Sequence, residues 1–417
     1  MSIFKINGPV QLKGNVKVSG AKNEALKLIA FAILLKTPVC IKNIPNIVDV
    51  ERQLEIFKFL GGKIKRIGSD IELDSSNVEK FDISKSTANK LRASLVYLGP
   101  LLSRFSQAII LQPGGCQIGE RPIETHLDAF RQLGATITEE KERIILNIDT
   151  IKCYKVVLRE QSVTATENIA MYAAGQEEKI TIENCATEPE ITALLDEMVK
   201  SGAQISGIGT RTLTIQGSKN LKLQTIEVIV DRIEAATFAI AFAATGGEGT
   251  IAPFPDKDLE SFVDVLKKCN VQIEINNNMA RISKSEKIVP FSISTSPYPG
   301  FPTDLQSPMS LLASRANGVS HIEETMYENR LGYLNELQKM GLDVTFDGVH
   351  KADIRGPVQL NPTTIHSLDL RSGITLLIAG LMSDGETIIK DAQIIDRGYE
   401  NIEDKLSHLG AKIKRIS

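Results

Sequence analysis

The sequence contains no tryptophan, and aromatic residues make up only 5% of its 417 residues. Its longest apolar run, residues 28–35, is far too short to span a bilayer. The formal net charge is only −3, so no global field favours nucleic acid or an anionic membrane. These shortages argue against a membrane-spanning protein and against a nucleic-acid module built on stacking aromatics.

Cysteine is also scarce, and the sequence shows no metal-binding pattern. The five cysteines are scattered and odd in number: Cys40, Cys116, Cys153, Cys185 and Cys269. The histidines share no motif either, so metal catalysis has no support. Free thiols are typical of proteins in a reducing compartment. The N-terminus lacks a basic segment followed by an apolar stretch, so we expect no signal peptide and a cytoplasmic protein.

What the sequence does contain is ordinary globular composition and internal repetition. Apolar residues make up 42% and charged residues 24%, and the length suffices for two domains. Six helix-ending segments recur, in which apolar positions at helical spacing precede a turn residue and a β-rich stretch. Their turn residues, separated by 68 to 73 residues, are Gly61, Gly134, Gly202, Asn270, Gly341 and Gly410. Glycine, or asparagine in its place, fits a left-handed helix C-cap.

Each repeat contains two helical patterns with short β-type segments between and after them. The unit therefore reads strand–helix–strand–helix–strand–strand, which predicts an α/β fold. Repeats one to three and repeats four to six would each form a compact half. No Pro-, Gly- or Ser-rich linker marks a boundary, so the period alone places the break near residues 218–230.

Basic residues stand where a helix start disfavours them. The first helix of four of the six repeats begins with a basic residue: Lys22, Arg92, Arg232 or Arg371. The second helix of two repeats carries Arg121 or Arg397, at the same distance in sequence before the turn residue. Helix N-termini attract phosphates and carboxylates, and lysine or arginine side chains at the same place strengthen the binding of such anions. We infer a site for a multiply charged anion. The alternative is that these side chains face solvent or pair with acidic neighbours.

The stretch 111–122 is an insertion confined to the second repeat. Three glycines and two prolines in twelve residues predict a loop, and a loop beside a cleft is a natural lid. Cys116 follows Gly114 and Gly115 and precedes Arg121, a setting that favours a thiolate or lets the thiol deliver a proton. The alternative is a structural cysteine on a loop. His126 lies on the following helix and is expected to be structural.

Six segments, in order along the whole chain, resemble the signature segments of one enzyme family. They read SGAKN from Ser19, LRAS from Leu91, PGGCQIGERP from Pro113, FPTD from Phe301, DLR from Asp369 and DRGYE from Asp396. The family is the UDP-N-acetylglucosamine 1-carboxyvinyltransferases, a branch of the enolpyruvyl transferases. PGGC-x-IG-x-RP is highly specific, whereas DLR or LRAS alone would mean little.

The resemblance implies an inside-out α/β barrel architecture, with helices inside and sheets outside. It implies two similar domains of three βαβαββ-type repeats each, with the active site in the interdomain cleft. In this family the N-terminal strand crosses to the second domain. We therefore expect residues 22–229 to form one domain, and residues 1–21 with 230–417 the other.

The resemblance also implies a reaction, the first committed step of bacterial peptidoglycan synthesis. The sugar 3′-hydroxyl adds to C2 of phosphoenolpyruvate, and phosphate then leaves a tetrahedral intermediate. No metal or redox cofactor is implied, and the partners are the two small substrates, with no nucleic acid, membrane or obligate protein partner. An epoxide antibiotic of the fosfomycin type would be expected to alkylate Cys116.

The family's functional residues carry over motif by motif. Cys116 becomes the proton donor and product-release residue, Asp304 the candidate base, and Asp369 and Arg371 supports of the cleft. Lys22, Arg121 and Arg397 would hold the charges of phosphoenolpyruvate. The nucleotide-sugar site would be lined by Asn23, Arg92, Arg121, Pro122, Ile123, Glu124, Thr125, Ser162, Val163 and Met326.

Three positions depart from the usual family pattern. Glu160 stands where a basic residue is frequent, Val230 where proline is usual, and Asn270 in place of a turn glycine. The departure at Glu160 bears on the uracil or diphosphate contacts. Rival interpretations are the sister enzyme acting on shikimate 3-phosphate, a nucleotide enolpyruvyl transferase of antibiotic biosynthesis, and a non-catalytic nucleotide-sugar-binding relative. The PGGC loop argues against the first of these.

Overall fold

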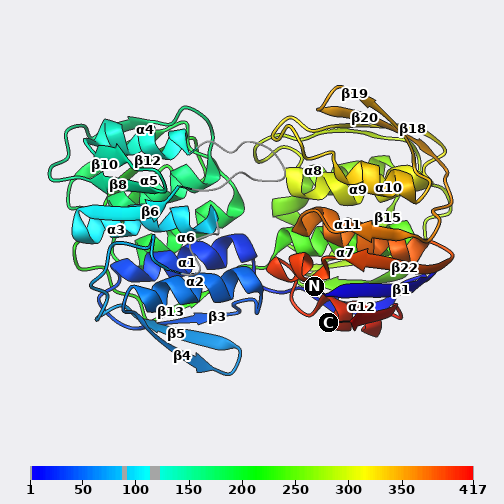
Figure 1. Cartoon of the computed structure of the whole chain (residues 1–417), viewed down its shortest axis with the longest axis horizontal. Coiled ribbons are helices and arrows are strands. Elements are labelled where there is room, and N and C mark those ends of the chain that lie inside the picture. Colours follow the sequence, from blue (N-terminus) through cyan, green and yellow to red (C-terminus); the bar gives the residue numbers. More distant parts are fainter. Residues whose placement is uncertain (1, 87–91, 113–122, 417) are drawn as a thin grey trace. The chain divides into compact units, whose positions relative to one another are not determined.

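A computed structural model describes residues 2–86, 92–112 and 123–416, with only the backbone described at residues 92 and 93. The described residues divide into two compact units. The first unit lies within residues 20–229, and the second unit consists of residues 2–19 and 230–416. Each has its own hydrophobic core. Figure 1 shows the helices and strands of both units and labels many of them.

The first unit alternates strands and helices through three repeats. Its elements are α1 (Lys22–Phe31), η1 (Ala32–Leu34), β3 (Val39–Lys42), α2 (Val48–Phe59), β4 (Lys63–Ile67), β5 (Asp70–Asp74), η3 (Arg92–Tyr97), α3 (Leu98–Phe105), β6 (Gln107–Leu111), α4 (Glu124–Leu133), β7 (Thr136–Glu139), β8 (Arg143–Asn147), β9 (Lys155–Val157), α5 (Val163–Ala174), β10 (Lys179–Glu183), α6 (Pro189–Lys200), β11 (Gln204–Ser206), β12 (Thr212–Gln216) and β13 (Thr225–Glu227).

The second unit repeats the same alternation, with two strands contributed by the N-terminal segment. Its elements are β1 (Ile3–Gly8), β2 (Lys13–Lys17), α7 (Arg232–Thr245), β14 (Glu248–Ala252), η4 (Asp256–Leu259), α8 (Glu260–Lys268), β15 (Gln272–Asn276), β16 (Met279–Ser283), β17 (Ser292–Ser294), α9 (Thr303–Arg315), β18 (Gly318–Glu323), α10 (Tyr333–Lys339), β19 (Asp343–Asp347), β20 (Lys351–Gly356), β21 (Thr364–His366), α11 (Leu370–Met382), β22 (Gly385–Lys390), η5 (Ala392–Arg397), α12 (Ile402–His408) and β23 (Lys412–Ile416).

The described strands form six small sheets, which confirms the predicted α/β class. Five of the sheets share one pattern: an outer strand runs parallel to the next strand, and two antiparallel strands follow. Their orders are β9-β10-β12-β11, β13-β3-β5-β4, β2-β14-β16-β15, β17-β18-β20-β19 and β21-β22-β1-β23. The sixth, β6-β8-β7, has three described strands.

Two strands are exchanged along the chain. β2 precedes α1 in sequence but pairs with β14 in the second unit, whereas β13 precedes α7 but pairs with β3 in the first unit. β1 completes the last sheet by lying between β22 and β23. The second unit therefore holds three repeats only because the N-terminal segment supplies two of its strands.

Helices occupy the interior of each unit, and the sheets cover it. In the second unit, α7, α9 and α11 pack on one another. Every residue of α7 from Arg232 to Ala244 is buried, as expected for a helix that is apolar almost all round. Figure 1 shows the sheet of β18 and β20 and the sheet of β1 and β22 on opposite sides of these helices. Strands such as β18 alternate buried and more exposed residues, so one face of the sheet meets the core.

The six predicted turn residues all adopt the left-handed conformation. Their φ angles range from +66° at Asn270 to +117° at Gly202. A side chain is costly at these angles for most residues, and asparagine is the usual exception. The prediction of six matched helix ends is therefore confirmed.

Candidate functional site

The basic residues singled out by the sequence do stand at helix starts in both units. Lys22 and Arg232 are the first residues of α1 and α7, and Arg371 is the second residue of α11. Arg92 begins the 3₁₀ helix η3, which leads into α3. All three side chains described, those of Lys22, Arg232 and Arg371, are buried. The prediction that basic residues stand at helix starts is confirmed at these positions, with Arg371 one residue further into its helix. The alternative that the side chains face solvent is wrong for these three, whereas pairing with acidic residues holds for Lys22 and Arg371.

Arg397 corrects the second half of that prediction. It is the last residue of the 3₁₀ helix η5 and not the start of a helix. The chain then bends at Gly398 and passes through Asn401, which is left-handed with φ +46°, before α12 begins at Ile402. A helix cannot continue through such a residue, so η5 and α12 are separate elements.

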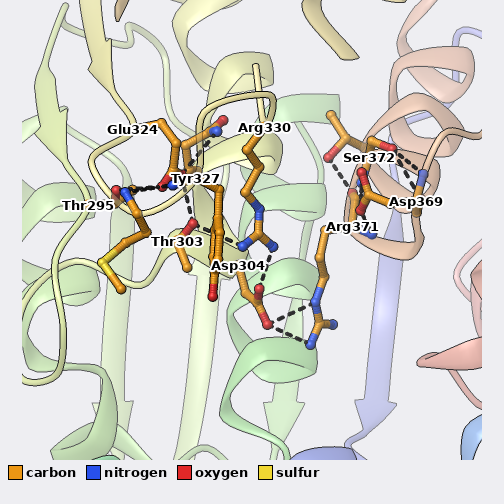
Figure 2. Close-up of polar contacts among 12 residues, drawn as sticks. Thr295, Thr303, Asp304, Glu324, Tyr327, Arg330, Asp369, Arg371 and Ser372 are labelled. Carbon is orange, nitrogen blue, oxygen red and sulfur yellow. Dashed lines mark hydrogen bonds and ion pairs between the residues drawn. The ribbon is translucent and has the colours of Figure 1, made fainter. Parts of the chain in front are cut away.

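Asp304, the candidate base, lies between two buried arginines in the second unit (Figure 2). It occupies the first turn of α9, where a helix start favours negative charge. Arg330 donates from Nη2 to Oδ1 at 2.5 Å. Arg371 donates from Nε to Oδ2 at 3.1 Å, and its Nη2 lies 3.0 Å from the same oxygen. The two arginine side chains are 6% and 5% exposed, against 25% for Asp304, so the carboxylate is the part of the cluster that solvent or a ligand can reach.

Both guanidinium groups remain charged in this environment. Burial alone would lower the pKa of Arg371, but the negative charge of Asp304, then the hydroxyl of Tyr399 and the charge of Asp231, raise it above its ordinary value. Burial likewise opposes the charge of Arg330, and Asp304 and Asp369 raise its pKa in turn. Charged hydrogen bonds of this kind are stronger and more directional than neutral ones. The cluster therefore presents fixed positive charge around one carboxylate.

Further side chains hold Arg371 in place. Its Nη1 lies 3.2 Å from the hydroxyl of Tyr399, whose ring faces the guanidinium at 5.5 Å. That hydroxyl also lies 3.1 Å from the hydroxyl of Thr237 on α7. Asp369 caps α11 by accepting hydrogen bonds from the backbone N–H groups of Arg371 and Ser372. Asp369 thus contacts the backbone of Arg371 at the start of α11.

Met326 lies on a turn organised by a buried carboxylate, Glu324, which no sequence pattern singles out. Glu324 accepts hydrogen bonds from the backbone N–H groups of Met326 and Tyr327, at 2.8 and 3.2 Å. It also accepts one from the hydroxyl of Thr303 at 2.7 Å. Figure 2 shows Glu324 and Arg330 converging on Thr303, beside Asp304. Asp304, the candidate base, and Met326, predicted to line the nucleotide-sugar site, therefore belong to one hydrogen-bond network.

The first unit holds the remaining described candidates. Lys22 forms an ion pair with Asp49 on α2, with 2.8 Å between Nζ and Oδ2, and both side chains are buried. Lys22 is therefore fixed at the start of α1, beside Asn23. The buried ion pair thus holds the Nζ of Lys22 in one position.

Two predicted nucleotide-sugar segments meet in the first unit. The hydroxyl of Thr125, near the start of α4, donates to the carboxylate of Glu160 at 2.9 Å. Glu160 lies just before Ser162, which caps α5, and Val163, the first residue of that helix. Ile123 and Glu124 are half-buried at the start of α4. The structure therefore brings the stretches 123–125 and 162–163 together, with a carboxylate at the junction.

His126 has the structural role expected of it. It is buried, and its ring nitrogens lie 3.0 Å from the hydroxyl of Thr164 and 3.0 Å from the amide of Asn168. Cys116, Arg121 and Pro122 lie outside the described residues, as does the side chain of Arg92.

Arg330 and Glu324 are the site residues that the sequence reasoning missed. Arg330 precedes the turn at Gly341 at an offset close to the one that drew attention to Arg121 and Arg397. A search that tolerated small shifts in the repeat would have found it. Glu324 carries no such signal, because its importance comes from the tertiary contacts of a buried carboxylate.

The described residues show neither a metal centre nor a membrane span. Among them, no group of three or more His, Cys, Asp or Glu side chains is arranged to hold a metal ion. None of the described helices combines the length and the apolar character that crossing a bilayer requires.

Comparison with known proteins identifies the family. The family model described as EPSP synthase (3-phosphoshikimate 1-carboxyvinyltransferase) matches residues 6–406. The chain belongs to this carboxyvinyltransferase family. A UDP-N-acetylglucosamine 1-carboxyvinyltransferase of Desulforapulum autotrophicum is 39% identical over 416 residues, covering 100% of both chains. A Bacillus cereus relative, UDP-N-acetylglucosamine 1-carboxyvinyltransferase 2, is 40% identical over 417 residues, covering 100% of this chain and 97% of its own.

Solved structures from the same family share the fold. The enolpyruvyl transferase NikO from Streptomyces tendae superimposes with a TM-score of 0.89 at 23% identity, covering 100% of this chain and 99% of its own. EPSP synthase from Acinetobacter baumannii gives 0.77 at 17% identity, with complete coverage of both chains. At these identities the likeness establishes the architecture of the carboxyvinyltransferase family and not the acceptor.

Proposed function

We propose that this enzyme transfers the carboxyvinyl group of phosphoenolpyruvate to the 3′-hydroxyl of UDP-N-acetylglucosamine and releases phosphate. The observation that carries the proposal is the end-to-end match, at 39–40% identity, to relatives named for that reaction. The segment PGGCQIGERP, residues 113–122, supports the same acceptor. The reaction would be the first committed step of peptidoglycan synthesis and would take place in the cytoplasm.

The chemistry requires an acid, a base and fixed cations. The 3′-oxygen adds to C2 of phosphoenolpyruvate while C3 gains a proton, giving a tetrahedral intermediate. C3 then loses a proton as the bond between C2 and the phosphate oxygen breaks, so the vinyl group is restored on the acceptor and phosphate leaves. General acid and base groups each contribute about 10²–10⁴-fold in such steps. Fixed cations stabilise the charge on carboxylate and phosphate.

We assign these roles to the residues selected by the sequence. Cys116 would supply the proton to C3, and Asp304 would accept the proton of the 3′-hydroxyl. Lys22, Arg121 and Arg397 would hold the anionic groups of phosphoenolpyruvate. The supporting observation for Asp304 is its setting, since two buried arginines fix both carboxylate oxygens at the start of a helix. For Lys22 it is the buried ion pair with Asp49.

In the first unit we propose Asn23, Arg92, residues 121–125, Ser162 and Val163 as contacts of the acceptor, supported by the hydrogen bond that joins Thr125 to Glu160. In the second unit we propose Met326, whose backbone N–H is held by Glu324. Asp369 and Arg371 would support the site from α11. The corresponding domains would be residues 22–229 and residues 1–21 with 230–417.

The test is phosphate release from phosphoenolpyruvate in the presence of three separate acceptors. UDP-N-acetylglucosamine, shikimate 3-phosphate and UMP would be supplied to the purified enzyme in parallel. Release with the nucleotide sugar alone is the expected result. Release of phosphate with shikimate 3-phosphate would indicate the activity of the sister enzyme instead. If the folded protein releases no phosphate with any of the three acceptors, a binding role would be favoured.

A further inference from the structure

Glu324 is a buried carboxylate with an unusual number of partners. It follows β18, is 0% exposed, and accepts hydrogen bonds at both of its oxygens. Oε1 accepts from the hydroxyl of Thr295 at 3.0 Å and from the backbone N–H groups of Met326 and Tyr327. Oε2 accepts from the hydroxyl of Thr303 at 2.7 Å and faces the amide of Gln306 at 3.4 Å. A buried carboxylate is tolerated only with such partners.

One branch of this network leads to Asp304. The Thr303 hydroxyl has a single proton, and Glu324 accepts it, so the oxygen turns its lone pair toward Arg330. Nη1 of Arg330 donates to that oxygen at 3.0 Å, while Nη2 donates to Asp304. The guanidinium is planar and rigid, so fixing one nitrogen also fixes the other. Glu324 thereby sets the orientation of the group that holds one oxygen of Asp304.

The other branch shapes the turn that carries Met326. Two consecutive backbone N–H groups of that turn point at the same carboxylate oxygen. The hydroxyl of Thr295, which donates to this oxygen, also accepts a hydrogen bond from the backbone N–H of Thr325 at 2.9 Å. The conformation of residues 324–327 therefore depends on the acceptor oxygen that Glu324 places at this turn. A neutral amide there would offer one acceptor oxygen and two donor protons in place of two acceptor oxygens.

We propose that Glu324 is a positioning residue that holds the base Asp304 and the acceptor-binding turn at Met326 in one fixed relation. The proposal rests on the proposed function, which gives Asp304 and Met326 their roles. Glu324 does not touch the substrate. It acts through Thr303 and Arg330 on one side and through the backbone of the turn on the other, so that the acceptor hydroxyl meets a correctly oriented carboxylate.

The first test compares Glu324→Gln with Glu323→Gln. Glu323 is the adjacent residue, is half-exposed and pairs with Lys351, so the same substitution there leaves the network intact. We expect Glu324→Gln to lower kcat by roughly 10- to 100-fold. We also expect a higher KM for the acceptor and an acid limb of the pH profile of kcat/KM at higher pH, because Arg330 holds Asp304 less firmly. Glu323→Gln should match the parent enzyme in all three.

A second pair of variants separates the branches. Thr303→Val removes the hydroxyl between Glu324 and Arg330 but leaves the turn at Met326 in place, whereas Thr303→Ser keeps the hydroxyl. We expect Thr303→Val to lower kcat and shift the acid limb with little change in the acceptor KM. Thr303→Ser should restore the values of the parent enzyme. A purely structural role would instead lower thermal stability and leave the pH profile unmoved.

The proposal is overturned if folded Glu324→Gln keeps the kcat, the acceptor KM and the pH profile of the Glu323→Gln control. Failure of the proposed function would look different, because the parent enzyme itself would then not turn over UDP-N-acetylglucosamine. In that case the carboxyl signal of Asp304 would be followed against pH by carbon NMR, with Asp304→Asn for assignment. If Glu324→Gln leaves the midpoint of the Asp304 titration unchanged, the positioning role is overturned independently of activity.

Discussion

Asp304 accepts hydrogen bonds from two buried guanidinium groups. A single substitution of Asp304 can remove its negative charge while its side chain keeps its size. Asp304→Asn keeps the size of the side chain but cannot accept a proton from the acceptor. We expect kcat to fall by about 10²–10⁴-fold, the usual contribution of a general base. Stability should fall as well, because Arg330 and Arg371 lose their shared counter-charge.

The measurement is phosphate release per folded enzyme, with folding checked by thermal unfolding. Asp353→Asn is the matched control, since Asp353 is an exposed residue of β20 that lies 2.7 Å from a ring nitrogen of His321. Its kcat should equal that of the parent enzyme. Undiminished turnover by Asp304→Asn would remove Asp304 from the mechanism.

Cys116 is expected to be alkylated by an epoxide of the fosfomycin type. Two of the other thiols are poor competitors, because burial raises the pKa of Cys185 to about 12 and that of Cys269 to about 11. Cys116→Asp should keep activity, since a carboxylic acid can still donate a proton, and should escape alkylation.

Mass spectrometry of the intact protein checks this expectation. The parent enzyme should gain one adduct and Cys116→Asp none. Cys153→Ser is the control, because Cys153 is exposed and should not account for the adduct. An adduct on Cys116→Asp would show that the reactive group lies elsewhere.

At the scale of elements, the start of α1 contains a carboxylate whose charge is costly. Glu24 is buried and accepts a hydrogen bond from the backbone N–H of Ile229 at 2.7 Å. Burial raises its pKa from 4.5 to about 8, and the charges of Glu190 and Glu197 act in the same direction. The folded state therefore binds this proton more tightly than the unfolded state does. The contribution of Glu24 to stability is greatest below about pH 4.5 and declines as the pH rises toward 8.

Glu24→Gln should flatten this decline, because the amide oxygen can still accept from Ile229 and no charge is buried. Urea unfolding between about pH 5 and pH 9 measures the effect. At the alkaline end the variant should have the higher free energy of unfolding. Glu55→Gln, on the exposed side of α2, should follow the parent curve. Parallel curves for Glu24→Gln and the parent enzyme would contradict the buried charge.

The ends and starts of the helices also show which features could be predicted from the sequence and which could not. The six turn residues were found from spacing, because a left-handed helix end restricts the residue type at one position. The helix starts at Lys22, Arg232 and Arg371 followed from the same register. Arg397 broke the pattern because η5 ends at Arg397 and the left-handed Asn401 stands before the start of α12 at Ile402. Glu324 could not be found at all, since hydrogen bonds between distant segments leave no local pattern.

At the scale of the whole molecule, the exchange of β2 and β13 decides which fragments are complete. Residues 20–229 include β13, which completes the sheet beside β3. Residues 230–417 lack β1 and β2, so β22 and β23 lose the strand between them and β14 loses a neighbour. Open sheet edges are unstable and prone to association.

We expect the fragment 20–229 to unfold cooperatively by circular dichroism. The fragment 230–417 should do so only after a peptide of residues 1–19 is added. Cooperative unfolding of 230–417 alone, at a temperature that the peptide does not change, would contradict the strand assignment. A peptide with the residues of 1–19 in scrambled order is the matched control.

We expect the enzyme to attach the carboxyvinyl group to the 3′-oxygen of UDP-N-acetylglucosamine. The most direct measurement is the identity of the product formed from phosphoenolpyruvate and that acceptor, by mass spectrometry and proton NMR. The expected product is a nucleotide sugar heavier than the acceptor by C₃H₂O₂, with two vinyl protons and an ether link at the 3′-carbon. An unchanged acceptor, or a vinyl ether formed only on shikimate 3-phosphate or UMP, would contradict this expectation.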